Sequence, residues 1–167
     1  MPSRPDAAPV IVGFDPGLHR TGYAALAAEP RPRLLEAGVL RIPADLPLAE
    51  RLRRLHADAT EILGDLKPAE VAVEELFSHY AQPKTAVLMG HARGVLLLAA
   101  ATAGATVSSY LPTRVKKTVA GAGHAGKEQI QRAVMIEFNL AVPPEPPDVA
   151  DALAIALCHC HARRHPR

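Results

Sequence analysis

Hydrophobic and polar positions alternate along the chain in two patterns, short apolar runs and longer amphipathic segments. The short runs are closed by Gly, Pro or charged residues, which predicts strands at 10–15, 21–28, 33–42, 71–75 and 105–110. The longer segments predict helices at 48–66, 85–103, 113–120, 127–138 and 148–161. Together these elements predict an α/β fold, with a mixed five-stranded sheet flanked by helices.

Two segments carry further information. The first two runs are separated by a turn with Pro16-Gly17, so we expect their strands to form a hairpin. The helix at 85–103 is apolar nearly all round, which is typical of a helix that is buried on most sides or pairs with a partner chain.

The composition is that of one globular domain. The chain has 167 residues, 49% of them hydrophobic, and we expect a single domain over 10–162 between a disordered tail (1–9) and a basic tail (163–167). No uninterrupted apolar run reaches the roughly 18–20 residues of a membrane span, and no secretory signal is seen. Two cysteines exclude a disulfide framework. We therefore expect a cytoplasmic protein with no membrane contact.

Acidic side chains occur at the ends of apolar elements, where they are unexpected. Asp15 and Glu74 each end an apolar strand, and Asp148 and Asp151 open an apolar helix. Carboxylates are rarely buried unless they are paired or bind metal. Asp148 and Asp151 share a helix face because they are three residues apart. Hard oxygen ligands of this kind suit Mg²⁺ or Mn²⁺, so all four are candidate metal ligands.

Some of these acids also have a structural explanation. Asp15 precedes Pro-Gly and suits a turn, and Asp148 follows two prolines and suits a helix N-cap. Glu75 is expected in solvent, because adjacent strand residues face opposite sides. Asp151 is the hardest to explain without a partner, since apolar residues flank it and no surplus of arginine lies nearby in sequence.

Positive charge is concentrated in one part of the chain. The formal net charge is only +2, but residues 76–131 hold a single acid, Glu128, against six basic side chains. The six are Lys84, Arg93, Arg114, Lys116, Lys117 and Lys127. A basic segment on a nearly neutral chain fits a polyanion partner, and a solvated helix face explains it about equally well.

Two segments resemble nucleotide sites incompletely. GAGHAGK (121–127) matches a phosphate-binding loop except that Glu128 stands where Ser or Thr would hold Mg²⁺. A turn like DPGLHRTG (15–22) also occurs in actin-like kinases, but those need two domains to enclose a nucleotide, and this chain is too short.

The segment CHCH (158–161) invites a zinc interpretation. Alternate helix residues point about 200° apart, so Cys158 and Cys160 cannot share a tetrahedral ion. We expect a helix end with satisfied cysteines and exposed histidines instead.

Five blocks of the sequence together resemble the RuvC family of Holliday-junction resolvases. The blocks are GFDPGLHRTGYA (13–24), VAVEELF (71–77), GHARG (90–94), VKKTVAGAGHAGKEQIQ (115–131) and DVADALAIALCHCH (148–161). They occur in the family's order between about residue 10 and residue 161. The resemblance implies an RNase H-like fold, a homodimer, a four-way DNA junction as substrate and a divalent metal.

The resemblance also implies roles for individual residues. Metal binding falls on Asp15, Glu74, Asp148 and Asp151. The family's aromatic residue falls on Phe77, which would contact bases at the crossover unless it is a core residue. The family's basic pair falls on Lys116 and Lys127, and Arg93, Arg114 and Lys117 are expected to position the DNA backbone. The roles of His79 and Tyr80 stay open.

These assignments suggest a mechanism. Two Mg²⁺ ions per active site, with Mn²⁺ possible, would be bridged by Asp15, with Glu74 completing one site and Asp148 and Asp151 the other. Water would attack in line and leave 5′-phosphate and 3′-hydroxyl ends, while Lys127 and Lys116 hold phosphate or stabilise charge. Lys127 therefore joins the four acids as a candidate catalytic residue.

The expected partners follow from symmetry and from the family. Two active sites on a two-fold substrate require a dimer, with the helix at 85–103 as its candidate interface. A branch-migration motor of the RuvA–RuvB type is implied by the family. The alternatives are a related RNase H-like nuclease and a nucleic-acid-binding protein without resolvase activity.

Overall fold

The protein, seen in a computed structural model, is described over residues 8–76 and 83–164. Phe77, His79 and Tyr80 lie outside these ranges. The strands are β1 (Val10–Asp15), β2 (Arg20–Ala27), β3 (Arg33–Arg41), β4 (Glu70–Glu74) and β5 (Thr106–Tyr110). The helices are α1 (Leu48–Leu66), α2 (Pro83–Thr102), α3 (Pro112–Ala120), α4 (Lys127–Phe138) and α5 (Pro147–Arg164). Every predicted element is present, and only α5 differs from its prediction by more than two residues at an end.

The five strands form one mixed sheet in the order β3-β2-β1-β4-β5. β1, β2 and β3 pair in antiparallel fashion, as the predicted hairpin requires, whereas β4 is parallel to both β1 and β5. Phe14 pairs with Val73 in the parallel register. The carboxyl ends of β1 and β4, with Asp15 and Glu74, therefore lie side by side at one edge of the sheet.

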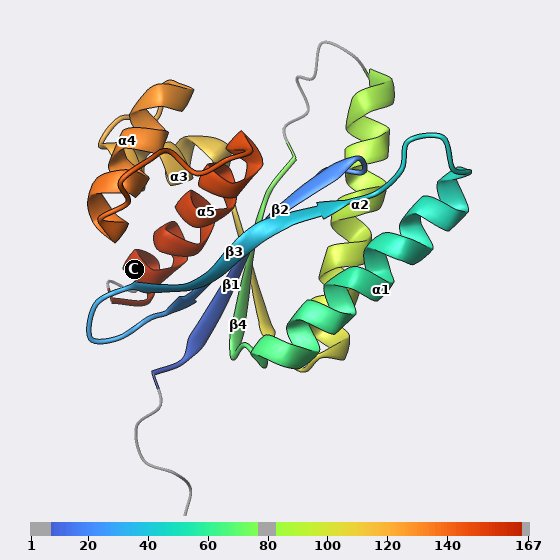
Figure 1. The fold of residues 1–167 in the computed structure, drawn as a ribbon, viewed down its shortest axis with the longest axis horizontal. Coiled ribbons are helices and arrows are strands. Elements are labelled where there is room, and N and C mark those ends of the chain that lie inside the picture. The colour runs from blue at the N-terminus through green and yellow to red at the C-terminus, as the bar shows by residue number, and fades with distance from the viewer. Residues whose placement is uncertain (1–7, 77–82, 165–167) are drawn as a thin grey trace, which may run out of the picture.

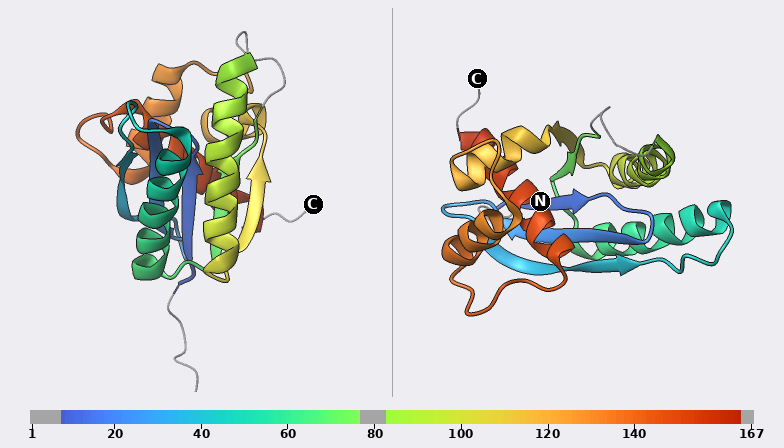
Figure 2. Two further views of the ribbon diagram at one scale, coloured as in Figure 1. Left: turned by 90° about the vertical axis from the view of Figure 1, so that its right-hand side faces the viewer. Right: turned by 90° about the horizontal axis from the view of Figure 1, so that it is seen from above.

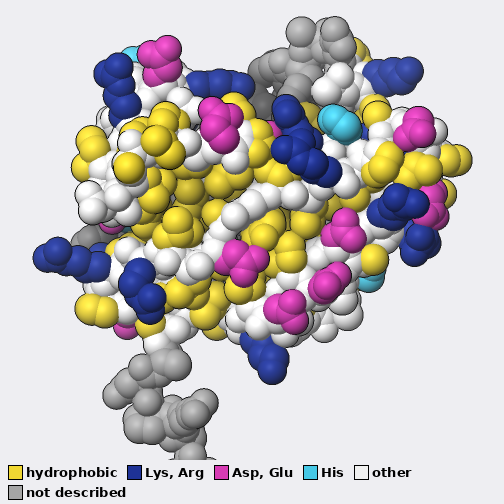
Figure 3. All heavy atoms as spheres, viewed as in Figure 1, with side chains coloured by type: hydrophobic (Ala, Val, Ile, Leu, Met, Phe, Trp, Pro, Cys, Tyr) yellow, Lys and Arg dark blue, Asp and Glu magenta, His cyan; other side chains and the backbone are white. Residues whose placement is uncertain are grey.

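Helices cover both faces of the sheet (Figures 1 and 2). The strand side chains alternate between two hydrophobic cores: Ile11 and Ala72 belong to the core under α5, and Val12 and Val71 to the core under α1 and α2. Because side chains two residues apart share a face, Asp15 and Glu74 point to the α5 side. In the face drawn in Figure 3, hydrophobic side chains gather in the middle and Lys and Arg side chains stand mainly around the margin.

Helix α5 is almost completely buried, because the sheet lies on one side of it and α3 and α4 on the other. Gly13 of β1 and Gly22 of β2 allow α5 to approach the sheet closely. A Cβ atom on Gly22 of β2 would lie 2.1 Å from the carbonyl oxygen of Asp148, so no larger residue fits there without movement. The helix begins at Pro147, which puts Asp148 in its first turn and corrects the predicted N-cap role.

Helix α2 is more exposed than its composition predicted. Ala92, Leu96 and Ala99 pack inward, but the side chains of Val87 and Leu98 are 60% and 58% exposed. Among the described helices α2 alone is long and apolar enough to span a bilayer by length and composition, although Lys84 and Arg93 interrupt its apolar sequence. A helix packed on the core of a soluble protein passes the same test, and α2 packs against α1.

The structure describes the inner residues of both expected tails, and these residues contact the folded domain. The carbonyl of Pro9 accepts a hydrogen bond from the Ala28 amide. At the other end, α5 continues to Arg164, and Nε of Arg163 pairs with Glu70 at 2.6 Å. The first two residues of the predicted basic tail therefore belong to the folded domain, and 1–7 and 165–167 lie outside the described residues.

Candidate active site

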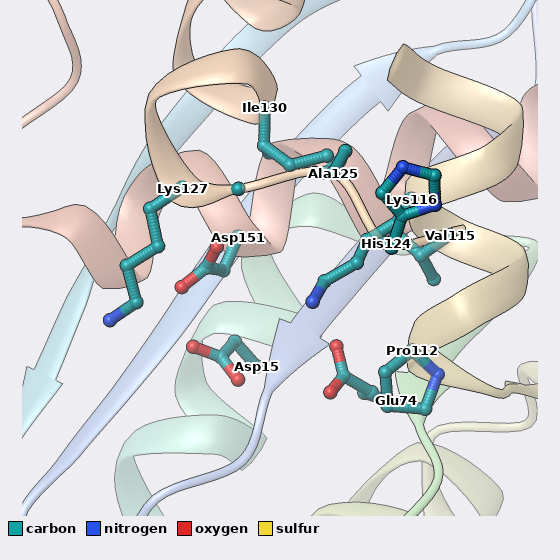
Figure 4. A pocket seen from close by; sticks show the side chains of 12 residues that line it. Asp15, Glu74, Pro112, Val115, Lys116, His124, Ala125, Lys127, Ile130 and Asp151 are labelled. Atoms are coloured by element: carbon teal, nitrogen blue, oxygen red, sulfur yellow. The ribbon is translucent and has the colours of Figure 1, made fainter. Parts of the chain in front are cut away.

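Carboxylates from three elements line one pocket of about 430 Å³ (Figure 4). Asp15 comes from the end of β1, Glu74 from the end of β4, and Asp151 from the second turn of α5. The pocket is closed by α3, the loop that follows it and the start of α4, which contribute Pro112, Val115, Lys116, His124, Ala125, Gly126, Lys127 and Ile130. The sheet register and the seat of α5 thus bring together acids that are far apart in sequence.

Burial and mutual repulsion make these carboxylates hard to ionise. Burial, then the charges of Asp151 and Glu74, raise the pKa of Asp15 to about 8. Burial, then the charge of Asp151, raise the pKa of Glu74 to about 7, and burial raises the pKa of Asp151 as well. The pocket therefore carries more acidic groups than its own basic groups neutralise.

Two lysines face the acids from the roof of the pocket. Figure 4 shows the ammonium ends of Lys116 and Lys127 directed toward the carboxylates. Lys127 lowers the pKa of Asp15 and Asp151, and Lys116 lowers the pKa of Glu74 and Asp151. The two lysines predicted from the sequence, Lys116 and Lys127, therefore both line the pocket that holds the acids.

Asp148 lies beside this pocket, not in its lining. Its charge contributes to the raised pKa of Asp15 and of Asp151, so the four predicted acids are neighbours. Its nearest cationic partner is Arg20, whose Nε is 3.4 Å from Oδ2. That oxygen is buried and has no hydrogen bond.

The donor set suits a divalent cation, although the side chains do not enclose one as they stand. Across residues 8–76 and 83–164, no three His, Cys, Asp or Glu side chains are arranged so that they could hold a metal ion. The chemistry nevertheless fits Mg²⁺ or Mn²⁺: hard carboxylate oxygens, raised pKa values, and a buried oxygen on Asp148 that accepts no hydrogen bond. Bringing Asp148 to the pocket acids would complete a four-carboxylate set.

The predicted DNA-contacting residues are not equally free to meet DNA. Arg93 on α2 is engaged inside the chain, where Nε donates to the carbonyl of Glu74 at 3.0 Å and Nη2 donates to the Ser109 hydroxyl at 2.7 Å. Arg114 on α3 lies over the ring of Tyr110, 5.0 Å from its centroid. The contacts of Arg93 indicate that it supports the backbone at Glu74, and its DNA contact stays a prediction.

A buried chain of polar groups ties α5 to the sheet. The Tyr110 hydroxyl donates to Nδ1 of His159 at 2.6 Å, and Nε2–H of His159 donates to Glu70 at 2.7 Å. His159 is only 4% exposed, and burial lowers its pKa, which suits this neutral form. The expectation of exposed histidines is wrong at this position, because His159 faces the sheet and not solvent.

The glycine-rich loop and the CHCH segment form neither a nucleotide site nor a zinc site in the described residues. The loop at 121–126 follows helix α3 and not a strand, and its Gly126 amide donates to the Gln129 side chain at 2.8 Å. Both cysteines are buried in α5, and the described residues include no cluster suited to zinc.

The sequence interpretation missed His124 and Arg20. His124 lines the pocket through the glycine-rich loop, where the phosphate-loop comparison drew attention only to the glycines and the lysine. Arg20 and Gly22 are two residues apart in β2, so both lie on the same face of the sheet. This spacing was the only local sign that Arg20 faces α5. Its partner Asp148 is 128 residues away in sequence, so no local pattern indicated the pair.

Comparison with known proteins gives a consistent result. The family model for Crossover junction endodeoxyribonuclease RuvC matches residues 11–159. A Crossover junction endodeoxyribonuclease RuvC of Rhodopirellula baltica is 51% identical over 98% of this chain and 93% of its own. The solved structure of Thermus thermophilus RuvC in complex with Holliday junction substrate is 40% identical, has a TM-score of 0.87 and covers 93% of this chain and 94% of its own.

A more distant structure shares the fold alone. The yeast mitochondrial Holliday junction resolvase Ydc2 is 11% identical, with a TM-score of 0.68 over 94% of this chain and 84% of its own. The expected RNase H-like architecture is therefore confirmed.

Proposed function

The chain belongs to the Crossover junction endodeoxyribonuclease RuvC family, and on this premise we propose that it resolves four-way DNA junctions by symmetric, metal-dependent hydrolysis of phosphodiester bonds. This activity would serve DNA recombination and repair. The observation that carries the proposal is the pocket in which Asp15, Glu74 and Asp151 meet under Lys116 and Lys127. Family membership and pocket chemistry point to the same reaction.

The four acids would hold the metal. Asp15, Glu74, Asp148 and Asp151 would be the ligands for Mg²⁺ or Mn²⁺, with two ions per active site. When bound, the ions supply Lewis acidity that activates water and neutralises charge on the leaving oxygen. Asp15 lies near both Glu74 and Asp151 in Figure 4, and its carboxylate would be shared between the ions.

The protein's own groups would orient the substrate around this centre. Lys127 and Lys116 hold the scissile phosphate and stabilise the charge that develops on its oxygens. Water attacks phosphorus opposite the 3′ oxygen, the P–O3′ bond breaks, and that oxygen takes up a proton. The products are a 5′-phosphate and a 3′-hydroxyl.

Contacts with the DNA backbone would extend from the pocket along α3. Arg114 and Lys117 share this short helix with Lys116 and would meet phosphates beside the cut. Phe77 would stack on bases at the crossover, where base stacking contributes about 1–3 kcal/mol. These contacts select for position along the backbone rather than for sequence.

A second copy of the chain would cover the outer face of α2. Val87 and Leu98 expose apolar surface there, and only 22% of the most apolar stretch of the helix is buried within the chain. A two-fold dimer places two identical sites on a junction, as symmetric cutting requires. A branch-migration motor of the RuvA–RuvB type and a cytoplasmic location are part of this proposal.

The test is cleavage of a synthetic four-way junction with and without divalent metal. We expect paired, symmetric nicks in Mg²⁺ or Mn²⁺ and none in chelator, with little cutting of linear duplex. Preferred cutting of an RNA–DNA hybrid would indicate a related nuclease of the same fold. Tight junction binding without cleavage under any metal would indicate a binding protein and contradict the proposal.

A further inference from the structure

Arg20 and Asp148 form an ion pair at the border of the active site. Arg20 opens β2 and Asp148 lies in the first turn of α5, directly above Gly22. The Arg20 Nε lies 3.4 Å from Oδ2 of Asp148, too long and too poorly directed for a hydrogen bond. The pair is therefore held by charge and not by a hydrogen bond.

The basic groups around the site are divided among the acids. The charge of Lys127 stabilises the ionised forms of Asp15 and Asp151, and the charge of Lys116 stabilises those of Glu74 and Asp151. Asp148 forms its ion pair with Arg20, from a strand that contributes nothing to the pocket lining. Arg20 is thus attached to the one acid that stands apart from the other three.

We propose that Arg20 competes with the divalent cation for Asp148 and thereby sets the metal affinity of the site. This inference rests on the proposed metal-dependent function. A guanidinium stays charged at any working pH, so it repels a cation at Asp148 until it moves away. The Arg20 side chain is 44% exposed, against 21% for Asp148, so it can turn into solvent while the carboxylate stays. The freed group then lies beside the acids, where a DNA phosphate would arrive.

The experiment measures Mn²⁺ binding to the full chain by calorimetry, without DNA. We expect R20Q and R20M to bind Mn²⁺ about tenfold more tightly than wild type, because a competing charge has been removed. R20K keeps the charge and should stay within about threefold. In a D148N background, R20Q should bring no gain, since the carboxylate over which they compete is gone.

R41Q is the matched control, because Arg41 is paired directly opposite Arg20 in the β2–β3 register and its loss changes the net charge equally. An equal gain from R41Q, a gain from R20Q that persists with D148N, or unchanged or weaker binding by R20Q would each overturn the role of Arg20. Wild-type protein that binds no Mn²⁺ would instead contradict the proposed metal site. Circular dichroism of each variant checks its fold, and R20Q and R20M provide two independent neutral variants.

Discussion

Gly13 of β1 lies directly beneath Ala156 of α5, so closely that a Cβ atom on Gly13 would fall 2.6 Å from the Ala156 nitrogen. The carbonyl oxygen of Ala152 would be equally near. The helix therefore rests on the bare backbone of the strand. Two residues further along β1 is Asp15, and near the start of α5 is Asp151, so this contact sets the separation between the two acids.

We expect G13A to damage the fold and the site together. The added methyl must push α5 away from β1, at a cost of about 1–3 kcal/mol in the free energy of unfolding, and junction cleavage should fall with it. Urea denaturation and a cleavage assay measure the two effects. G64A is the control, because a Cβ at Gly64 on α1 meets nothing within 4 Å and alanine favours a helix. A G13A protein with wild-type stability and activity would refute this account of the contact.

Replacing Asp15 by Asn should separate binding from chemistry. The amide keeps the size of the side chain but is a poor ligand for a hard cation, so cleavage should fall at least about a hundredfold. Junction affinity should change little, because the basic groups of α3 and α4 remain. Gel-shift and cleavage assays on the same junction provide the comparison. Near wild-type cleavage by D15N would exclude Asp15 as a metal ligand.

The raised pKa values predict how stability depends on pH in the absence of metal. The pKa of Asp15 is about 8 in the folded state against 3.8 for an ordinary aspartate, and that of Glu74 is about 7 against 4.5. Between these limits the folded chain keeps protons that the unfolded chain has released. The free energy of unfolding in chelator should therefore fall as pH rises from about 5 to about 8, by at most about 1.4 kcal/mol per pH unit for each group.

The D15N variant and added Mg²⁺ test whether these carboxylates cause the pH dependence. D15N should flatten the slope, because its side chain does not titrate, and Mg²⁺ should stabilise the wild type more at pH 8.5 than at pH 6, since it replaces the protons. Urea melts across this pH range measure both. A slope that D15N leaves unchanged would assign the effect to other groups.

Removing the Lys127 charge should weaken phosphate binding. K127A should reduce the salt dependence of junction affinity by about one counterion and lower the cleavage rate beyond the loss in binding, because the lysine faces Asp15 and Asp151. Affinities measured from 50 to 300 mM salt give the slope. R33A removes a charge at the start of β3, at the opposite end of the sheet, and should change neither quantity. Equal slopes for K127A and wild type would end the phosphate assignment.

A charge on the outer face of α2 should separate the proposed dimer. L98E places a carboxylate where 58% of a leucine side chain is exposed. If a dimer buries this face, its dissociation constant should rise at least tenfold, which is about 1.4 kcal/mol. Sedimentation analysis measures the mass, and paired nicking should become single. I136E alters an even more exposed side chain on α4 and should leave the mass unchanged. If L98E keeps the mass of the wild-type protein, the dimer interface does not lie on this face of α2.

The local pattern of the sequence determined the elements and the identity of the acids. Hydrophobic spacing predicted all five strands and all five helices, since periodicity reflects which face is buried. Asp15, Glu74 and Asp151 were recognisable because a carboxylate at the end of an apolar element needs a partner. Lys116 and Lys127 came from the family's motifs, and the structure puts both at the pocket.

Only the tertiary structure decided which side chains meet. Arg93 supports the Glu74 backbone across 19 residues, His159 joins Glu70 across 89, and Arg20 reaches Asp148 across 128. Such pairs depend on the order of strands in the sheet and on the close seat of α5 against Gly13 and Gly22. Local sequence records the tendency of a segment to bury one face, but the geometry of packing selects the partner that it is buried against.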